Sequence, residues 1–239
     1  MTITSAHNEK LKEVRKLNAR RRERERSGRF VAEGEDLLAA ADAAGWGALT
    51  RLSVEGSGLG GEEVLPVLLD GVSELGSGTR ALAIYEERWA SAPSGPLCVY
   101  LHGVHDPGNV GAVLRSAQAF GASCVALGPG SADPYGPKAV RASMGSIFSV
   151  PLARAESITE LPGTKVALDA DAPAALSELS LEGAVTLLIG AEREGLPEEL
   201  KSAADQLVAI PTAIHSLNAA MAATVALYEL TTRRIGAGT

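Results

Sequence analysis

The sequence predicts an α/β fold, a parallel sheet with helices on both faces, preceded by a small α/β domain. Three observations support this prediction. In the second half of the chain, short apolar runs alternate with stretches of helical periodicity, as in βαβ units. Those runs are nearly continuous, which is typical of strands buried on both faces. Aromatic residues make up only 4% of the 239 residues, so the core must consist of aliphatic side chains.

The first domain is predicted to span residues 1–90. It begins with a basic helical run at residues 10–29, in which Leu11, Val14 and Leu17 recur at helical spacing. The expected strands then lie at residues 29–32, 49–54 and 81–84, and the expected helices at residues 35–44 and 62–69. The stretch WASAPSGP that follows has linker composition, so a linker is expected at residues 91–96.

The second domain is predicted to span residues 97–239. Its expected strands lie at residues 97–104, 123–127, 165–168, 184–189 and 207–210, and its main helices at residues 110–120 and 217–235. Ligands bind beyond the carboxyl ends of the strands in open parallel sheets. Polar residues that follow these strands are therefore candidate site residues.

Charge is distributed unevenly along the chain. The net charge is −7, but residues 1–34 hold ten Lys or Arg against five Glu, and the remaining residues hold twelve against 24 acids. Such asymmetry indicates a charged partner. The basic run is either a solvated helix with Glu–Arg pairs or a surface that contacts phosphates, and its own residues leave the two readings even. The candidate phosphate contacts are Lys12, Arg15, Lys16, Arg20, Arg21 and Arg22.

Several classes of protein are disfavoured by composition. The apolar runs are too short to cross a bilayer, and the first residues lack the apolar core of a secretory signal. Cys98 and Cys124 lie in apolar runs, as small buried hydrophobes in a reducing compartment do. Two cysteines and four scattered histidines give no metal-ligand spacing. We therefore expect a cytoplasmic protein with no membrane association and no metal.

A glycine-rich stretch at residues 56–61 (GSGLGG) formally matches the G-x-G-x-x-G dinucleotide fingerprint. That fingerprint also needs an acidic residue at the end of the second strand to hold the ribose. Glu74 is near the right distance, but glycines surround it. We predict a flexible loop here, with a nicotinamide oxidoreductase as a rival function.

Three later segments carry more chemistry, at residues 109–122, 188–200 and 209–230. In the first, Asn109 is placed to cap a helix, and Arg115 points away from the apolar face of that helix. In the second, Gly190 ends a strand and would let a ligand approach the backbone, with Glu192 two residues further on.

The third segment carries the triplet SLN at the head of the last helix. Ser216 is the expected N-cap of that helix. Asn218 has weak helix propensity and, one turn into the helix, no comparable structural reason to be there. Polar residues of these types follow the carboxyl ends of three strands, which we call strand exits. Their presence at three strand exits predicts one composite site.

In order and spacing, the three segments resemble the three motifs of the SpoU (TrmH-type) RNA ribose 2′-O-methyltransferases, which belong to the knotted SPOUT class. Residues 133–151 (DPYGPKAVRASMGSIFSVP) resemble the stretch between the first two motifs. The N-terminal region resembles the RNA-binding domain of that family, which is similar to a ribosomal L30-type fold. The resemblance covers nearly the whole chain.

The resemblance implies a C-terminal domain with a deep trefoil knot that forms an S-adenosylmethionine pocket. Backbone groups at Gly190, Ile210 and Leu217 would bind that cofactor. The family works as a homodimer with a site that draws on both subunits. The positions that match its functional residues are Asn109, Arg115, Glu192, Ser216 and Asn218.

The chemistry of the site residues suggests their roles. A guanidinium with a pKa above about 12 is a poor base near neutrality, so we expect Arg115 to hold the phosphate beside the target ribose. Ser216 and Asn218 would orient the hydroxyl or the loop, while Asn109 and Glu192 would hold Arg115 and the RNA backbone. The loop at residues 212–215 is shorter than is usual in the family, and its His215 is expected to face solvent.

The identity of the RNA is less determined by the sequence. An appended N-terminal domain favours 23S ribosomal RNA as the substrate, with transfer RNA as an alternative. The methyl group serves either ribosome maturation or antibiotic resistance. A non-catalytic RNA-binding module remains an alternative if the short loop abolishes cofactor affinity.

Overall fold

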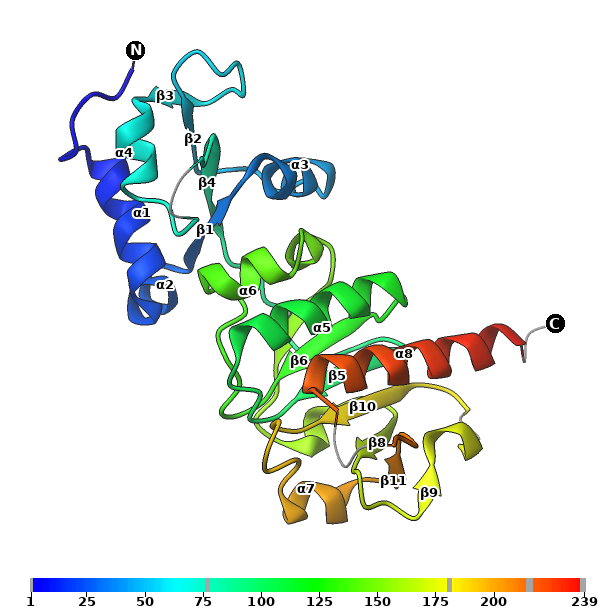
Figure 1. Ribbon diagram of the computed structural model, residues 1–239. Coiled ribbons are helices and arrows are strands. Elements are labelled where there is room, and N and C mark those ends of the chain that lie inside the picture. The colour runs from blue at the N-terminus through cyan, green and yellow to red at the C-terminus, as the bar shows by residue number, and fades with distance from the viewer. Residues whose placement is uncertain (1, 76–77, 180–181, 214–216, 237–239) are drawn as a thin grey trace. The chain divides into compact units, whose positions relative to one another are not determined.

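The computed structural model describes residues 2–75, 78–179, 182–213 and 217–236, and the chain forms two compact units (Figure 1). Unit 1 comprises Met1–Glu87 together with Asp133–Ser149, and unit 2 comprises Arg88–Ala132 together with Val150–Thr239. The sequence placed all of residues 97–239 in one domain. The packing differs at Asp133–Ser149, whose contacts lie within unit 1.

Unit 1 is built on a four-stranded sheet in the order β1-β4-β2-β3. Strand β4 pairs antiparallel with both β1 and β2, and β2 pairs parallel with β3. The strands are β1 (Arg29–Glu33), β2 (Thr50–Val54), β3 (Glu62–Val64) and β4 (Ala81–Glu86). The helices are α1 (Glu9–Ala19), α2 (Arg21–Ser27), α3 (Glu35–Ala43) and α4 (Pro66–Asp70). Leu11, Val14 and Leu17 on α1 are buried, as their spacing predicted.

Two predictions for unit 1 were wrong. The basic run is not one helix, because Arg20 adopts extended backbone angles (φ −134°, ψ 112°) that end α1 and precede α2. The helix predicted at residues 62–69 is strand β3 followed by the short helix α4. Pro66 stands at the first position of α4, where its missing N–H costs nothing, so the helix begins there.

The glycine-rich stretch at residues 56–61 joins β2 to β3. A dinucleotide fingerprint instead requires a strand followed directly by a helix. Gly61 has φ +82°, and a Cβ there would overlap the carbonyl of Arg51. The stretch is therefore a loop that connects two parallel strands, and the strand-to-helix geometry of a nicotinamide site is absent from this described segment.

Residues 133–149 are fixed in unit 1 by an aromatic cluster. The chain has only two Trp, four Tyr and three Phe, yet five of these nine residues pack together here. They are Phe30, Trp46, Tyr85, Tyr135 and Phe148, with ring centroids as close as 4.7 Å. Trp46 also donates a hydrogen bond to the carbonyl of Phe148 at 2.9 Å. Aromatic pairs of this kind each contribute about 0.5–1.5 kcal/mol beyond the area they bury.

A buried ion pair fixes the same segment. The guanidinium of Arg24 lies 2.8 Å from the carboxylate of Asp133, and the two side chains are only 7% and 15% exposed. Helix α6 (Pro137–Ala142) follows Asp133 and packs against β1. Segment Asp133–Ser149 therefore belongs to the core of unit 1.

Unit 2 contains a seven-stranded sheet in which every neighbouring pair is parallel, in the order β7-β6-β5-β10-β8-β11-β9. The strands are β5 (Leu97–Leu101), β6 (Cys124–Leu127), β7 (Leu152–Arg154), β8 (Thr164–Leu168), β9 (Ala174–Ala175), β10 (Val185–Ile189) and β11 (Gln206–Ala209). Every residue of the central strands β5 and β10 is buried, which confirms the reading of their continuous apolar runs. Cys98 and Cys124 are buried, free and paired in register on β5 and β6.

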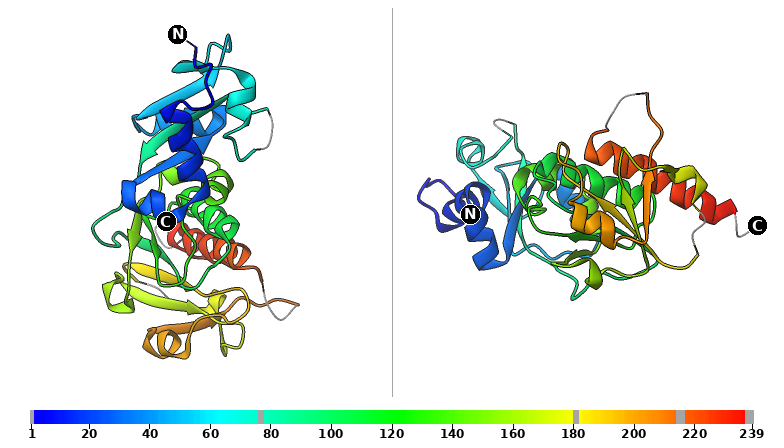
Figure 2. Two further views of the ribbon diagram at one scale, coloured as in Figure 1. Left: turned by 90° about the vertical axis from the view of Figure 1, so that its left-hand side faces the viewer. Right: turned by 90° about the horizontal axis from the view of Figure 1, so that it is seen from below.

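Helices cover both faces of this sheet. Helices α5 (Pro107–Ala119) and α8 (Ala219–Gly236) lie side by side on one face, and α7 (Glu198–Ala203) lies on the other (Figure 1, Figure 2). The hydroxyls of Ser116 and Thr224 are 2.6 Å apart between α5 and α8. None of the described helices is both long enough and apolar enough to span a membrane. The predicted parallel sheet with helices on both faces is confirmed.

Candidate functional site

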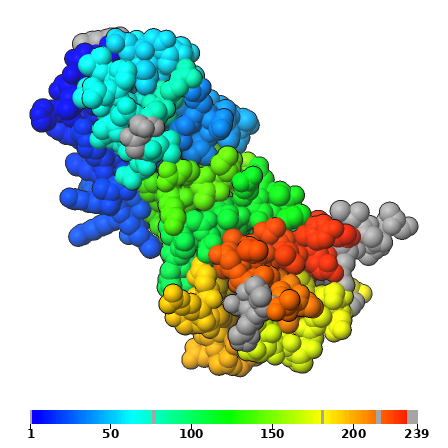
Figure 3. Space-filling view, viewed as in Figure 1, coloured from blue at the N-terminus to red at the C-terminus, as the bar shows by residue number. Residues whose placement is uncertain are grey.

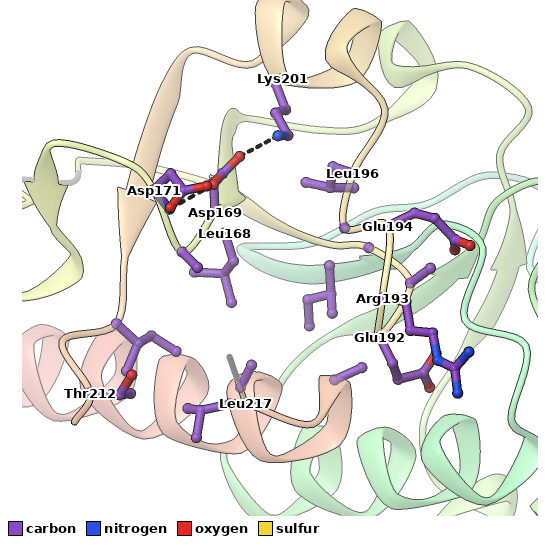
Figure 4. Close-up of a pocket in the computed structure, with 18 residues that line it drawn as sticks. Leu168, Asp169, Asp171, Glu192, Arg193, Glu194, Leu196, Lys201, Thr212 and Leu217 are labelled. Carbon is purple, nitrogen blue, oxygen red and sulfur yellow. Dashed lines mark hydrogen bonds and ion pairs between the residues drawn. The ribbon is translucent and has the colours of Figure 1, made fainter. Parts of the chain in front are cut away.

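A pocket of about 470 Å³ opens at the carboxyl edge of the sheet in unit 2 (Figure 4). Residues 168–171, at the end of β8 and beyond, and residues 189–196, at the end of β10 and beyond, form two of its walls. Ile210 after β11 and Leu217 before α8 also line it, as do residues of α7 and α8. Its size lies within the range of small-molecule sites. The structure thus brings Gly190, Ile210 and Leu217 to one cavity.

The wall after β10 is a loop that closes on itself. The backbone N–H of Ala191 donates to the carbonyl of Gly195 at 3.1 Å, and that of Gly195 donates back at 3.0 Å. A Cβ on Gly190 would overlap the backbone of Gly195 and Leu196. The missing side chain at Gly190 is therefore required by the closure of this loop, not by a ligand as we had expected.

Three polar side chains from three strand exits meet beside this pocket. The amide nitrogen of Asn109, on α5, donates to the carboxylate of Glu192, which lines the pocket. The amide nitrogen of Asn218 donates to the amide oxygen of Asn109 at 3.0 Å. Glu192 and Asn218 lie 83 and 109 positions beyond Asn109 in the chain. We call these three residues the amide–carboxylate network.

Asn109 does not cap its helix, contrary to our expectation. Helix α5 begins two residues earlier, at Pro107, and its N-cap is Asp106, whose carboxylate accepts a backbone hydrogen bond at 2.7 Å. Asn109 is already within the first turn. Its side chain is therefore available to the network.

Asn218 has the structural role that we had assigned to Ser216. Its amide oxygen accepts from the backbone N–H of Ala220 at 2.9 Å, as an N-cap of α8 does. Its amide nitrogen remains for Asn109. Ser216 and His215 lie outside the described residues.

Arg115 stands apart from the network. It lies on α5, six residues beyond Asn109 and so about 9 Å further along the helix axis. Its side chain is exposed and forms no hydrogen bond or ion pair with any residue in the described ranges. Within one chain Asn109 and Glu192 bond to each other, and the expectation that they hold Arg115 stays a prediction.

A further charged pair on the pocket wall was missed from the sequence. Lys201 on α7 lies 2.5 Å from the carboxylate of Asp169 and 2.9 Å from that of Glu198. The hydrogen bond from Lys201 lowers the pKa of Asp169, and the two carboxylates raise the pKa of Lys201 to about 12. Asp169 directly follows the predicted strand 165–168, so the strand-exit rule could have found it. Nowhere in the described ranges do three or more His, Cys, Asp or Glu side chains gather as a metal site.

The predicted phosphate contacts lie on and between the two N-terminal helices of unit 1. Lys12 pairs with Glu9 and Arg21 with Glu25, each at 2.7 Å, and Arg15 donates to a backbone carbonyl. The other three are exposed and form no ion pair with any described residue: Lys16, Arg20 and Arg22. Part of the basic run therefore forms Glu–Arg or Glu–Lys pairs, as in a solvated helix. Another part remains available to contact phosphates.

Two known families of protein domains match this chain. Residues 96–228 match the model of the SpoU rRNA Methylase family, and residues 8–63 match that of the MRM3-like substrate binding domain. The chain belongs to the SpoU rRNA methylase family. The family match covers every strand of the parallel sheet, the pocket and the amide–carboxylate network.

Relatives of this SpoU protein include enzymes that act on ribosomal RNA. A 23S rRNA (uridine(2479)-2′-O)-methyltransferase of Streptomyces viridochromogenes is 38% identical over 56% of this chain, and the match spans about half (51%) of that relative. The 23S rRNA (guanosine(2553)-2′-O)-methyltransferase RlmP of Bacillus subtilis is 30% identical over 95% of this chain and 98% of its own length. The crystal structure of the SpoU methyltransferase AviRb from Streptomyces viridochromogenes, in complex with AdoMet, is 30% identical. It has a TM-score of 0.86 and covers 96% of this chain and 99% of its own.

Proposed function

We propose that this chain transfers a methyl group from S-adenosylmethionine to a ribose 2′-hydroxyl of 23S ribosomal RNA. The observation that carries the proposal is the amide–carboxylate network, which sets polar side chains from three strand exits beside a pocket of cofactor size. The N-terminal match to a substrate binding domain supports a large substrate. The similarity to RlmP, over nearly the full length of both chains, supports ribosomal RNA.

The pocket fits S-adenosylmethionine in both shape and charge. Leucine side chains form apolar walls that suit the adenine base. The ionisable groups around it are Asp169, Asp171, Glu192, Glu194, Arg193 and Lys201. Four acids against two bases give an acidic surround, which favours a sulfonium cation. Backbone groups at Gly190, Ile210 and Leu217 line the same cavity and would hold the cofactor.

When bound, S-adenosylmethionine supplies an electrophilic sulfonium methyl group for the 2′-oxygen. The residues of this chain must then place the hydroxyl and the group that accepts its proton. The network fixes the side chain of Glu192 and the amide of Asn109 at the pocket wall, so no reorganisation is needed when the ribose arrives. Arg115 holds the neighbouring phosphate, and the hydroxyl proton passes to an oxygen of that phosphate. Positioning of this kind can supply about 7–11 kcal/mol of the barrier reduction.

The separation of Arg115 from the network suggests a second subunit. Three apolar side chains of α8 form an exposed stripe at helical spacing: Met221, Val225 and Tyr228, which are 58%, 42% and 57% exposed. Figure 3 shows α8, coloured orange to red, at the surface of unit 2. We propose that this stripe pairs two copies of the chain, and that Arg115 of one serves the network of the other. We also propose that this domain is knotted, as membership of the SpoU family implies.

Mapping ribose methylation in RNA from cells with and without the gene tests the proposed function. One 2′-O-methyl group should be missing from 23S ribosomal RNA in the deletion strain. A loss confined to transfer RNA, or no loss at all, would contradict the proposal. In the purified enzyme, Arg115→Ala should lose most turnover. Near-normal turnover of Arg115→Lys would support charge placement over bidentate geometry.

A further inference from the structure

An ion-paired carboxylate lines the pocket across from the amide–carboxylate network. Figure 4 shows Asp169, Asp171 and Lys201 on one side of the cavity and Glu192 on the other. The side chain of Asp169 is 10% exposed, and what remains accessible faces a pocket that it lines. The reacting methyl group must lie near the network, so Asp169 meets a different part of the ligand.

The carboxylate of Asp169 is held in one orientation by separate contacts to each of its oxygens. Lys201 lies 2.5 Å from Oδ2, and the backbone N–H of Asp171 donates to Oδ1 at 2.8 Å. The backbone N–H of Asp169 donates to the carbonyl of Val208 at 3.0 Å, which ties the residue to β11. Each carboxylate oxygen has two lone pairs. Each therefore keeps one acceptor position free, and the pair is preorganised.

The chemistry of this arrangement suits two neighbouring hydroxyl groups. Lys201 offsets part of the charge of Asp169 and fixes Oδ2, while the N–H of Asp171 fixes Oδ1, so the carboxylate presents two adjacent acceptors that match the two hydroxyls of a diol. Leu168 directly precedes Asp169, and Leu217 lines the same cavity, so an apolar slot for a base adjoins the carboxylate. A carboxylate that accepts from ribose hydroxyls beside a base is a recurrent solution in nucleotide sites.

We propose that Asp169, positioned by Lys201, accepts the hydrogen bonds of the ribose hydroxyls in the nucleoside part of S-adenosylmethionine. This inference rests on the proposed function, because it takes that cofactor as the ligand. Asp169 is then a specificity determinant for the nucleoside, and Lys201 is a positioning residue that acts through it.

Calorimetry with two ligands tests the assignment. S-adenosylhomocysteine carries the nucleoside and the amino-acid tail, whereas 5′-methylthioadenosine carries the nucleoside alone. Asp169→Asn should weaken the binding of both by a similar factor, about tenfold to a hundredfold, because hydrogen bonds to a charged acceptor are lost. Glu198→Gln is the matched control. Glu198 also contacts Lys201, but it is 83% exposed and does not line the pocket, so this variant should bind both ligands like the wild type.

A deoxy ligand tests the same contact without altering the protein. The wild-type chain should bind the 2′-deoxyribose analogue of S-adenosylhomocysteine about tenfold more weakly than the parent compound. Asp169→Asn should discriminate little between the two. Equal discrimination in both proteins would overturn the inference.

Two further outcomes separate the inference from the proposed function. If Asp169→Asn weakens S-adenosylhomocysteine but leaves 5′-methylthioadenosine unchanged, Asp169 contacts the amino-acid tail and the inference is wrong. If the wild-type chain binds neither ligand, the proposed function fails and the inference fails with it. Binding of both ligands by the wild type and the variant alike would reject the inference alone.

Discussion

Replacing Asn109 by Asp changes one N–H donor of the amide–carboxylate network into an acceptor and leaves the shape of the side chain intact. In the native chain the amide of Asn109 donates to Glu192 and accepts from Asn218. The substitution sets two carboxyl groups against each other across the first contact. We therefore expect Asn109→Asp to make methyl transfer dependent on pH.

Coulomb's law gives the magnitude. Two unit charges 4 Å apart repel by about 1 kcal/mol in water and about 4 kcal/mol at an effective dielectric constant of 20. Since 1.36 kcal/mol corresponds to one pKa unit, the second ionisation of the pair rises by roughly one to three units. From ordinary carboxyl pKa values of about 4, the raised pKa falls at roughly 5 to 7. Below it the pair keeps one proton and one hydrogen bond, so activity is retained; above it both groups are charged and activity is lost.

The pH profile of kcat/KM for methyl transfer measures this effect. Asn109→Asp should fall in activity as the pH rises from about 5 to 8, while Asn109→Ala, which adds no charge, should show a loss that does not depend on pH. A uniform loss in both variants would refute the reasoning, because it would mean that the contact with Glu192 does not matter to the reaction. Thermal unfolding at each pH controls for loss of the fold.

Three other predictions address the RNA surface, the dimer and the pocket loop. Changing Lys16, Arg20 and Arg22 to Gln should weaken RNA binding and lower the slope of log affinity against log salt by up to about 3, since each phosphate contact contributes about 0.9; an unchanged slope in filter-binding assays would place the RNA elsewhere. Val225→Glu puts a charge into the apolar stripe of α8, so sedimentation velocity should show monomers, and an undiminished dimer would contradict the proposed interface. Gly190→Ala forces the closed loop after β10 apart, so affinity for S-adenosylhomocysteine should fall more than tenfold by calorimetry, and an unchanged affinity would show that the loop is not part of the site.

The sequence predicted the parallel sheet well because burial on both faces leaves a plain pattern. The run of β5 is entirely apolar, that of β10 is apolar except for Thr186, and both strands are fully buried. Edge strands leave less signal: β7 has three residues and β9 only two, too few for any periodicity. Neither was predicted.

The packing of residues 133–149 against unit 1 could not be predicted from local pattern. Arg24 lies in the run RRERERS, where nothing distinguishes it from Arg21. Arg21 pairs with Glu25 one turn away, as a surface arginine does. Arg24 is buried and pairs with Asp133, which is 109 residues distant. Only the tertiary fold decides which arginine is buried, and breaking such a pair by removing one partner typically costs about 3–5 kcal/mol.

Helix capping explains why the site residues could be found but not their roles. An asparagine near the start of a helix is normally accounted for by the cap. At α5 that role is filled by Asp106, with Pro107 fixing the first turn, so Asn109 has no part in starting the helix. At α8 the cap uses only the oxygen of Asn218, which leaves its N–H groups for Asn109.

The contacts of Asn109 then determine its residue type. The side chain at position 109 must donate to a carboxylate and accept from an amide at the same time. It must also be long enough to reach both groups from α5. Aspartate has the reach but no donor when ionised, and alanine has neither group. Serine has a single oxygen for both bonds, whereas the amide places donor and acceptor on separate atoms. The network, rather than the helix, therefore selects asparagine at position 109, and this is the reason that a substitution as small as Asn109→Asp should change how the reaction responds to pH.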